Sequence, residues 1–517
     1  MNIVIPMAGR SQRFKDQGYD GPKYMLPLGD QSVIERLITC FAPDDQYHFI
    51  ISRNQVEETA GLQLFLESIV KFSTVHVIDD HNLGPAHSVL QIIDAIDDKE
   101  LLITYCDFLV DWDYQAFVSF ASGWDSVIPT FSGFQPASFG DTLFAYIRRD
   151  DEGRLLELRE KRCFTDNRVE EPASVGIYYF SSAEIFSVYA RKVIADADRD
   201  LPEAYVSLLA NPMVRDGLAV ATFDVAKFIC LGTPRDYEEF IYWQGVLQHP
   251  PTDIVALARE PLVDVNLLPM AGSGSRFREA RFETPKPLLA FNQAPLIEHA
   301  TRCLPTSRRS IYVCRMNEFL LNRLRRHLTE LVGGLSLINL SEMTAGQLDT
   351  CLAAAGEIED EESVFIASCD YSVKYNVDSW DAFMQDKDCD VAIWTNQLGS
   401  MPVRRYEAFG YCELGAANDV TRVVEKVTLG PTPWKDPMIV GSFWFRNWKT
   451  FRQLGDIVAE RGSYDPTREN FIGVNLNYLI EMGYKVKCFW VDEWISYGDP
   501  FEYEIIHFWS EYIEGLD

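Results

Sequence analysis

The stretch Val265–Leu289, VNLLPMAGSGSRFREARFETPKPLL, joins a short apolar strand to a glycine-rich turn and a proline-flanked lysine. Glycines such as Gly272 and Gly274 let the backbone approach a ligand closely, and successive backbone N–H groups form an anion-binding nest. A helix that begins after the turn would add its positive end. Arg276 and Lys286 supply full positive charges. The stretch therefore predicts a site that holds an oligophosphate.

The same pattern occurs near the start of the chain. Ile3–Leu28 reads IVIPMAGRSQRFKDQGYDGPKYMLPL, 263 residues before the second copy. In the first copy Ser11 stands in place of Gly274, which predicts a weaker anion nest. The alternative for both copies is an ordinary glycine turn followed by a surface lysine. This alternative has more weight for the first copy than for the second.

The repeat extends over nearly the whole chain. The offset of 263 persists from Leu101–Asp107 to Val364–Asp370, and later matching pairs lie 265 or 266 residues apart. Order and spacing that are kept over this length indicate a tandem duplication of a whole domain rather than a solenoid. Pro250 and Pro251 interrupt helix and strand alike. We therefore expect one domain at 1–247, a linker at 248–261 and a second domain at 262–517.

Within each half, short apolar runs alternate with amphipathic ones. This β-α-β-α order predicts an α/β fold with a mostly parallel sheet covered by helices on both faces. Later strand-like segments lack equally clear helices between them, so the sheet should be mixed. In the first half the expected strands are Ile3–Ile5, Phe49–Ser52, Val75–Ile78, Leu101–Tyr105, Phe144–Arg148 and Val175–Phe180. The expected helices are Val33–Phe41 and Ala86–Ile96.

Composition narrows the classes of function. The 517 residues, 47% of them hydrophobic, suffice for two or more domains with substantial cores. The formal net charge of −30 disfavours nucleic acid and anionic lipid as partners, whereas a local basic loop can still hold a small anion. The chain lacks a membrane-length apolar run and a signal-peptide pattern, so we expect a cytoplasmic protein without membrane insertion. Eleven cysteines without a CxxC pair argue against a disulfide framework and a zinc ribbon.

Each half also carries an aspartate at the end of an apolar strand and a Glu-Lys pair further on. Asp107 and Asp370 fall where ligands bind in such sheets. A carboxylate there suits Mg²⁺, which takes one or two protein oxygens together with phosphate and water, and the alternative is a helix cap or a turn residue. Lys161 and Lys426 follow Glu160 and Glu425 and could bind a second phosphate; the alternative is a solvated ion pair.

On these motifs the chain resembles two copies of a sugar-phosphate nucleotidyltransferase, the family of nucleotide-sugar pyrophosphorylases with a GT-A-like α/β fold. It is most similar to the bacterial subgroup linked to capsule, lipopolysaccharide and other surface polysaccharides. The motifs are MAGSGSRF…PKPLL, MAGRSQRF…PKYMLPL, the Cys-Asp and Glu-Lys pairs, and LGTPRDY at Leu231–Tyr237. The resemblance implies transfer of a nucleoside monophosphate from an NTP to a phosphorylated sugar or similar small molecule, with release of pyrophosphate.

The resemblance also implies roles for individual residues. Catalysis would be alignment and charge neutralisation, because a phosphate oxygen is already a nucleophile. The leaving pyrophosphate would be stabilised by Arg13, Lys23, Arg276 and Lys286, and Mg²⁺ would be held by Asp107 and Asp370. The nucleotide would bind at Met7, Ala8, Gly9, Gly84, Met270, Ala271, Gly272, Ser273, Gly274, Ser275, Gly346 and Gln347. The acceptor would bind at Glu160, Lys161, Gly176, Glu425, Lys426 and Gly441.

The chain departs from the family where a second metal aspartate is usual, two residues before a late glycine. Cys230 and Ser496 stand at these places, which argues against two-metal catalysis unless Asp224, Asp492 or Asp499 substitutes.

Two other functions stay open. The first is a GT-A-like glycosyltransferase, for which Asp111-Trp112-Asp113 has the Asp-x-Asp spacing of a metal site. The second is a non-catalytic nucleotide-binding protein. Both halves could work on different substrates, or one half could be regulatory. The nucleotide base, the acceptor and the oligomeric state, a homo-oligomer included, are not determined by the sequence.

Overall fold

The computed structural model describes residues 1–140, 142–196, 203–248, 260–398, 405–465 and 469–514. The chain forms two compact units, Met1–Ile241 and Tyr242–Asp517. Most of the predicted linker at 248–261 lies outside the described residues, so the predicted limits at 247 and 262 stay a prediction. Among the helices described, none combines the length and the apolar character that crossing a membrane requires.

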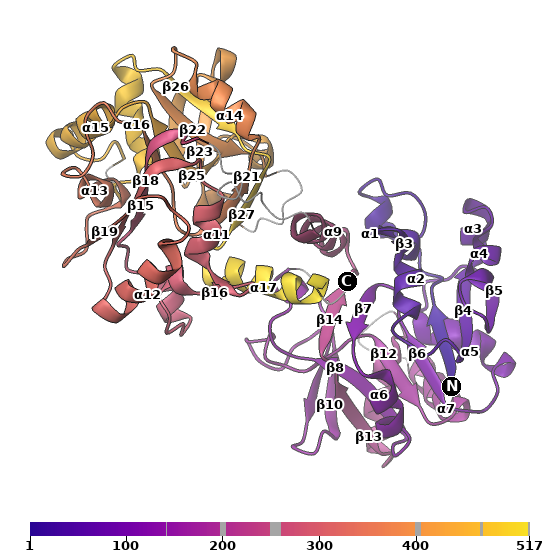
Figure 1. Cartoon of the computed structure of the whole chain (residues 1–517). Helices are drawn as coiled ribbons and strands as arrows, with labels where there is room; N and C mark the ends of the chain where they lie inside the picture. The colour runs from indigo at the N-terminus through magenta and orange to yellow at the C-terminus, as the bar shows by residue number, and fades with distance from the viewer. Residues whose placement is uncertain (141, 197–202, 249–259, 399–404, 466–468, 515–517) are drawn as a thin grey trace. The chain divides into compact units, whose positions relative to one another are not determined.

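A mixed sheet whose parallel strands lie at one end organises the first unit (Figure 1). Its strands are β1 (Asn2–Pro6), β4 (Gln46–Ser52), β5 (Ser73–Ile78), β6 (Leu101–Thr104), β8 (Ser126–Phe131), β9 (Ala145–Arg149), β10 (Leu155–Glu160), β11 (Ala173–Ser174), β12 (Ile177–Phe180) and β13 (Val220–Asp224). They run in the order β10-β9-β11-β8-β12-β6-β1-β4-β5, with β13 beside β8. Strands β1, β4, β5 and β6 are parallel, and β12 is antiparallel to β6. The predicted mixed sheet is confirmed.

Helices of the first unit begin where the sequence offers a capping side chain. Ser32 and Ser52 each form a capping box, with Glu35 and Gln55 respectively, and so satisfy free N–H groups of the first turn. The helices are α1 (Gln12–Lys15), α2 (Val33–Ile38), α3 (Arg53–Glu58), α4 (Leu62–Ser68), α5 (Pro85–Ile92), α6 (Tyr114–Ala121), α7 (Ala183–Ala195), α8 (Ala210–Arg215) and α9 (Pro234–Gln248), which continues into the second unit. Small strand pairs are β2 (Pro27–Leu28) with β3 (Gln31–Ser32), and β7 (Phe108–Asp111) with β14 (Lys227–Cys230).

The second unit repeats this topology. Its strands are β15 (Val263–Met270), β18 (Ser307–Cys314), β19 (Leu335–Asn339), β20 (Val364–Ile366), β22 (Val391–Asn396), β23 (Gly410–Leu414), β24 (Val420–Glu425), β25 (Met438–Phe445) and β26 (Val486–Trp490). The central order β19-β18-β15-β20-β25-β22-β26 matches β5-β4-β1-β6-β12-β8-β13. The small pairs recur as β16 (Ala290–Phe291) with β17 (Ala294–Pro295), and β21 (Tyr371–Lys374) with β27 (Glu493–Ser496). The duplication predicted from the sequence is therefore a duplication of the fold.

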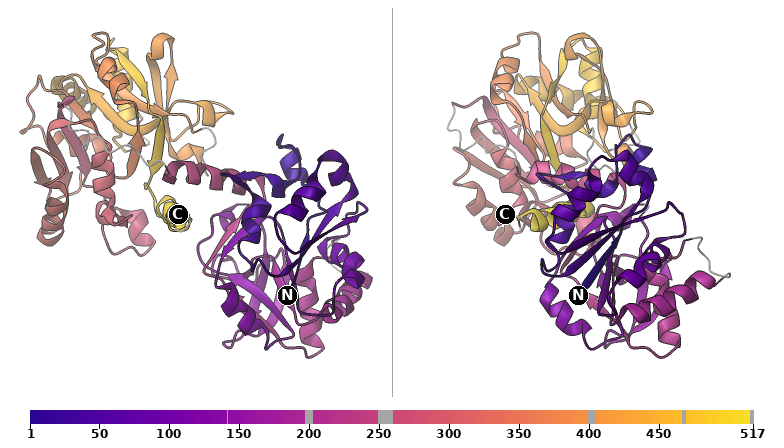
Figure 2. Two further views of the ribbon diagram at one scale, coloured as in Figure 1. Left: turned by 45° about the vertical axis from the view of Figure 1, so that its right-hand side comes forward. Right: turned by 90° about the vertical axis from the view of Figure 1, so that its right-hand side faces the viewer.

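Both faces of the second sheet are covered, as Figure 2 shows from two further sides. Along β15, Val265 and Leu267 join one buried apolar cluster, and Leu268 and Met270 join another, so alternate side chains enter opposite cores. The cluster that contains Leu268 and Met270 is completed by helices α11 (Leu296–Arg302), α12 (Glu318–Leu328) and α14 (Val377–Met384). Helices α13 (Gln347–Leu352), α15 (Trp448–Arg461) and α16 (Ile472–Glu481) complete the other. The remaining helices are α10 (Ser275–Glu279) and α17 (Pro500–Glu514).

The predicted helix Val33–Phe41 ends at Ile38, and two further predicted elements differ in detail from the structure. The predicted strand Val175–Phe180 begins only at Ile177, as β12, because Gly176, which lies between β11 and β12, takes a left-handed conformation with φ of 96°. The predicted helix Ala86–Ile96 ends as an α-helix at Ile92 and continues as a 3₁₀ turn, Ile93–Ala95. These differences are local, and the order of strands and helices is as predicted.

Candidate active site

The glycine-rich loops follow β1 and β15 and lead into helices of only one turn. Gly274 has φ of 61°, a left-handed conformation that favours glycine, and Ser11 takes the same conformation with φ of 53°. Ser11 therefore leaves the backbone conformation at this position as it is at Gly274, although its presence predicts a weaker anion nest. Ser11 Oγ accepts a hydrogen bond from the Lys23 N–H at 3.1 Å, which ties the loop to the lysine segment.

Gln55 holds the first loop from beneath. Its side-chain amide donates to the carbonyl oxygens of Met7 at 2.8 Å and Gly9 at 3.1 Å. Gln55 is buried, and its side-chain oxygen accepts from the Ser52 N–H in the capping box of α3. The helix start thus fixes the loop. Sequence reasoning missed Gln55, because this residue lies outside the repeated loop motif.

The lysine and the aspartate of the first unit meet at the end of β6. Lys23 Nζ lies 2.5 Å from Asp107 Oδ2, and about a quarter of each side chain is exposed. Burial lowers the pKa of Lys23, but attraction to Asp107 and the hydrogen bond between them outweigh this and leave the pKa raised. Lys23 is therefore a fixed positive charge at neutral pH.

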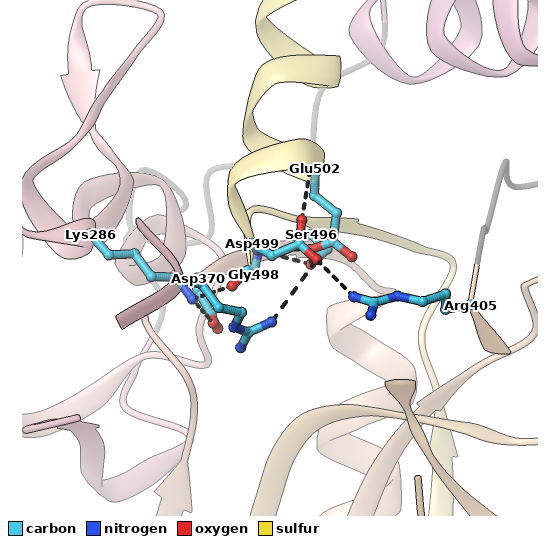
Figure 3. A network of polar contacts seen from close by, with 8 residues as sticks. Lys286, Asp370, Arg405, Ser496, Gly498, Asp499 and Glu502 are labelled. Carbon is cyan, nitrogen blue, oxygen red and sulfur yellow. Dashed lines mark hydrogen bonds and ion pairs between the residues drawn. The ribbon is translucent and has the colours of Figure 1, made fainter. Parts of the chain in front are cut away.

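The second unit contains the same pair at the end of β20. Lys286 Nζ donates to Asp370 Oδ2 and, at 2.8 Å, to the carbonyl oxygen of Gly498 (Figure 3). Ser368 Oγ donates to the other carboxylate oxygen of Asp370. Burial raises the pKa of Asp370, and the opposing effects of Lys286 and the two hydrogen bonds lower it overall, so the carboxylate is ionised.

The Glu-Lys pairs place each lysine over an aromatic ring. Lys161 and Lys426 have φ of 57° and 56°, left-handed conformations that a lysine adopts at a cost. Lys161 Nζ lies 4.4 Å from the centroid of the Tyr205 ring and donates to its hydroxyl at 2.5 Å. Lys426 Nζ lies 4.8 Å from the centroid of the Phe471 ring. Sequence reasoning missed both rings, although they lie 266 residues apart and extend the repeat.

The glutamates of these pairs turn away from solvent. Ser207 Oγ donates to Glu160 Oε2 at 2.5 Å, and burial raises the pKa of Glu160. In the second unit a side chain at Gly410 or Gly473 would collide with the Glu425 carboxylate, so the two glycines make room for it. Each glutamate is thus held by neighbouring residues of the fold, and Glu160 also lines the cavity of the first unit.

A cavity of about 490 Å³ in the first unit gathers most of the predicted residues. Arg13 and Lys23 enter it from the loop side, Asp107 from the end of β6, and Lys161 from the end of β10. Its other walls are largely aromatic. Lining side chains also include Glu160, Gly176, Tyr105, Phe108, Phe144, Tyr178, Tyr205, Phe228 and Cys230. One cavity thus brings Arg13, Lys23 and Lys161 together with Asp107.

The other predicted nucleotide residues surround the loops or lie in the segments before α5 and α13. Gly9 and Gly272 have open space where a side chain would be, whereas Met7 and Ala271 are buried beneath the loop. Gly84 and Gly346 are different, because a Cβ atom there would lie 2.5 Å from the backbone of Ala204 or 2.8 Å from that of Asn470. Both glycines are needed for packing, and Gly84 is not among the residues that line the cavity of the first unit. The remaining residues follow their neighbours: Ala8 and Met270 precede the loop glycines, Ser273 and Ser275 flank Gly274, Gln347 begins α13, and Gly441 lies against the Tyr371 ring.

Comparison with known proteins agrees with this geometry. Residues 3–167 match the family model of the MobA-like NTP transferase domain, and residues 266–503 match the model of the nucleotidyl transferase family. The chain is a tandem pair of nucleotidyltransferase-family domains. The first comprises the loop, Lys23 and Asp107, and the second comprises their counterparts.

Relatives of the nucleotidyltransferase domains are distant in sequence. The bifunctional protein GlmU of Methanocaldococcus jannaschii is 22% identical over 215 residues, which make up 42% of this chain and 48% of that protein. The chain thus spans about half the length of this curated relative. A nucleoside-diphosphate-sugar pyrophosphorylase from Vibrio cholerae RC9 is 23% identical, with a TM-score of 0.40, over 46% of this chain and 99% of that one. A UTP-bound UGPase from Acinetobacter baumannii is 16% identical, with a TM-score of 0.37, over 48% and 94%.

The candidates for a second metal aspartate lie in different surroundings. Asp224 pairs with Arg149 at 2.9 Å and accepts from Thr130, and it is not among the cavity-lining residues. Asp492 lies in the turn between β26 and β27. Asp499 caps α17 by accepting from the Glu502 N–H at 3.0 Å and lies near two arginines.

A buried carboxylate instead lies behind each replaced position. Cys230 Sγ is 3.6 Å from Asp236 Oδ2, and Ser496 Oγ donates to Glu502 Oε2 at 2.6 Å. Burial raises the pKa of both Asp236 and Glu502. Each of these two positions is thus in contact with a carboxylate of the final helix of its domain.

The Asp-x-Asp segment of the glycosyltransferase alternative does not reach the cavity. Asp113 Oδ1 accepts from the Ala116 N–H at 2.9 Å and is the N-cap of α6. Neither Asp111 nor Asp113 lines the cavity of the first domain. This segment is a helix start.

The carboxylates of the site meet the requirements of Mg²⁺ only in part. In the part of the chain that the structure describes, no three His, Cys, Asp or Glu side chains are grouped to hold a metal ion. A single carboxylate, Asp107 or Asp370, nevertheless fits Mg²⁺ when phosphate oxygens and waters complete the coordination. Each carboxylate oxygen retains a lone pair beside its hydrogen bond. The residues therefore fit a metal ion that arrives together with a nucleotide.

Proposed function

We propose that the chain transfers a nucleoside monophosphate from an NTP to a phosphorylated sugar or similar small acceptor and releases pyrophosphate. The observation that carries the proposal is the ion pair between a loop lysine and a strand-end aspartate, Lys23–Asp107 and Lys286–Asp370, which occurs in both domains. A lysine that neutralises phosphate beside a carboxylate suited to Mg²⁺ serves phosphoryl chemistry. Membership of the nucleotidyltransferase family supports the reaction class.

In the proposed reaction the chain aligns two anions. The N–H groups of the loop and Arg13 or Arg276 bind the triphosphate, and Lys23 or Lys286 neutralises charge that develops on the leaving pyrophosphate. Bound Mg²⁺ would supply further charge neutralisation at Asp107 or Asp370. The acceptor phosphate attacks the α-phosphorus directly, so the mechanism needs no covalent intermediate on the protein and no general base.

Lys161 and Lys426 would hold the acceptor phosphate. Their left-handed backbone and the aromatic ring beneath each ammonium fix the charge opposite the loop. In the first domain the aromatic walls of the cavity are suited to the non-phosphate part of the acceptor. The activated product would supply the synthesis of surface polysaccharide such as capsule or lipopolysaccharide, in the cytoplasm. The two domains then act in parallel, act on different acceptors, or include one regulatory member.

One screen tests the reaction class. Full-length protein with Mg²⁺ is incubated with each NTP and a panel of sugar 1-phosphates and other phosphorylated acceptors, and pyrophosphate is measured. We expect release with one combination or a few, and its loss in the Lys23→Ala, Lys286→Ala double variant. Free nucleoside diphosphate formed from nucleotide-sugars, without pyrophosphate from any NTP, would instead support a glycosyltransferase. NTP binding by calorimetry without turnover would support a nucleotide-binding protein.

A further inference from the structure

Two arginines of the second domain converge on one carboxylate oxygen. Arg276, in α10 directly after the glycine loop, has Nη1 at 4.0 Å from Asp499 Oδ2. Arg405 approaches the same oxygen with Nη2 at 3.8 Å (Figure 3). The two arginines are separated by 129 residues, and their side chains are 65% and 72% exposed, whereas that of Asp499 is only 18% exposed. The carboxylate thus lies in the site and the guanidinium groups reach it from outside.

The contacts are ion pairs without hydrogen bonds, since both distances exceed the hydrogen-bond range. Ion pairs between exposed side chains are individually weak. Bidentate phosphate binding by arginine is much stronger, because the planar guanidinium donates two parallel hydrogen bonds to an oxyanion. A phosphate that enters between Arg276 and Arg405 would therefore displace the carboxylate at small cost.

Asp499 is also specific to the second domain. The corresponding residue in the first domain is Thr233, the threonine of the Leu231–Tyr237 motif. Thr233 Oγ1 accepts from the Asp236 N–H at 3.2 Å, as Asp499 Oδ1 accepts from the Glu502 N–H at 3.0 Å. Both residues cap the final helix, and only Asp499 adds a negative charge. A cap does not require this charge, because Asn and Thr also cap helices well.

We propose that Arg276 and Arg405 form a two-arginine phosphate clamp in the second domain, and that Asp499 occupies the clamp until a phosphorylated ligand displaces it. The clamp rests on the proposed function, because its ligand is the oligophosphate of that reaction. Asp499 is a built-in competitor: it keeps both guanidinium groups at the site and lowers the affinity of the site for anions. Arg405 is a binding residue that neither the loop motif nor the repeat indicates.

Calorimetry with inorganic pyrophosphate, in the absence of Mg²⁺, tests the clamp on the full-length chain. Lys23→Ala is included throughout, so that the second domain dominates the signal. We expect Asp499→Asn to tighten pyrophosphate binding about 3- to 10-fold, because two weak ion pairs no longer compete. Asp499→Thr, which installs the first-domain residue, should do the same. Arg405→Ala should weaken binding about 10-fold.

The double variant Asp499→Asn, Arg405→Ala is decisive, because the gain from Asp499→Asn should shrink once Arg405 is absent. Asp492→Asn, in the neighbouring turn, is the matched control and should change nothing. Full additivity in the double variant, or unchanged affinity in both Asp499 variants, would overturn the clamp while leaving the proposed function intact. If the parent protein binds no pyrophosphate and addition of Lys286→Ala changes nothing, the proposed function and the clamp fail together.

Discussion

Lys23 Nζ lies 2.5 Å from Asp107 Oδ2, and 84 residues of sequence separate the two. Lys286 and Asp370 are paired across the same separation of 84 residues. In the first unit β4 and β5 come between the partners in the chain, but β6 lies directly beside β1 in the sheet, so the pair forms when these two strands are neighbours. The charge pair at the site therefore depends on the correct order of the strands.

Replacing one lysine at a time should separate the contributions of the two domains. We expect Lys23→Ala and Lys286→Ala each to lower the pyrophosphate release of its own domain about 100-fold or more, because each removes a preorganised charge at the leaving group. Initial rates at saturating NTP measure this. Lys99→Ala is the control, since Lys99 forms an exposed pair with Asp97. If both single variants and the double variant keep full activity, the assignment of these lysines is wrong.

Tyr205 can be exchanged for the residue of the other domain. Tyr205→Phe keeps the ring beneath Lys161 and reproduces the Lys426–Phe471 arrangement, so the KM for the acceptor should hardly change. Tyr205→Leu removes the ring and should raise this KM about 2- to 5-fold, the usual value of a cation–π contact. Steady-state kinetics with the acceptor varied would show this. Equal effects of the two substitutions would mean that the hydroxyl, rather than the ring, fixes Lys161.

The loop glycines allow a test of backbone conformation. Gly274→Ala should lower the free energy of unfolding by about 1–2 kcal/mol, because φ of 61° is unfavourable for alanine. Gly272→Ala is the matched control, since a Cβ atom there would meet nothing within 4 Å and the φ of Gly272 is not in the left-handed region. Urea unfolding compares the two. A larger loss in Gly272→Ala would contradict the loop geometry.

The stability of the first unit should fall at mildly acidic pH. His48 is buried, its Nδ1 lies 3.1 Å from His76 Nε2, and burial followed by the neighbouring His76 lowers its pKa to about 4. The unfolded chain binds a proton near pH 6.5 and the folded chain does not. The contribution of neutral His48 to the free energy of unfolding is therefore present above pH 6.5. About 3 kcal/mol of it is lost as the pH falls towards 4.

His48→Gln should flatten this dependence, because glutamine does not titrate. Urea unfolding between pH 7 and 4.5 measures the difference between the variant and the parent protein. His507→Gln, which lies in the second unit, serves as the control. An identical pH dependence of His48→Gln and the parent would show that other groups cause it.

Much of the fold could be predicted because the same sequence pattern occurs in both halves of the chain. Alternation of apolar runs indicates the parallel strands, and the constant offset shows that Asp107 and Asp370 close equivalent strands. The interruption of the strand pattern at Gly176 could not be predicted, since a glycine in a strand pattern is compatible with either a continuous strand or a bulge. The packing of Gly84 against Ala204 was equally invisible, because it joins segments 120 residues apart.

The site was predictable where charge and spacing decide it, and not where side chains come from unmatched segments. The loop, the lysines and the aspartates are linked by the repeat. Arg405 and Gln55 belong to neither motif, and their positions depend on tertiary packing. The contacts of Cys230 with Asp236 and of Ser496 with Glu502 depend on the position of the final helix, which the sequence motifs do not indicate.

Gln55 also determines the electrical polarity of the first loop. A trans peptide directs its C=O and N–H to opposite sides, so a side chain that holds the oxygens of Met7 and Gly9 turns the N–H groups of Ala8 and Arg10 the other way. The loop then presents partial positive charge before any ionised residue contributes. Its preference for anions is built into the direction of its peptide planes, and changes of the surrounding arginines and lysines would alter how strongly the loop binds rather than which sign of charge it accepts.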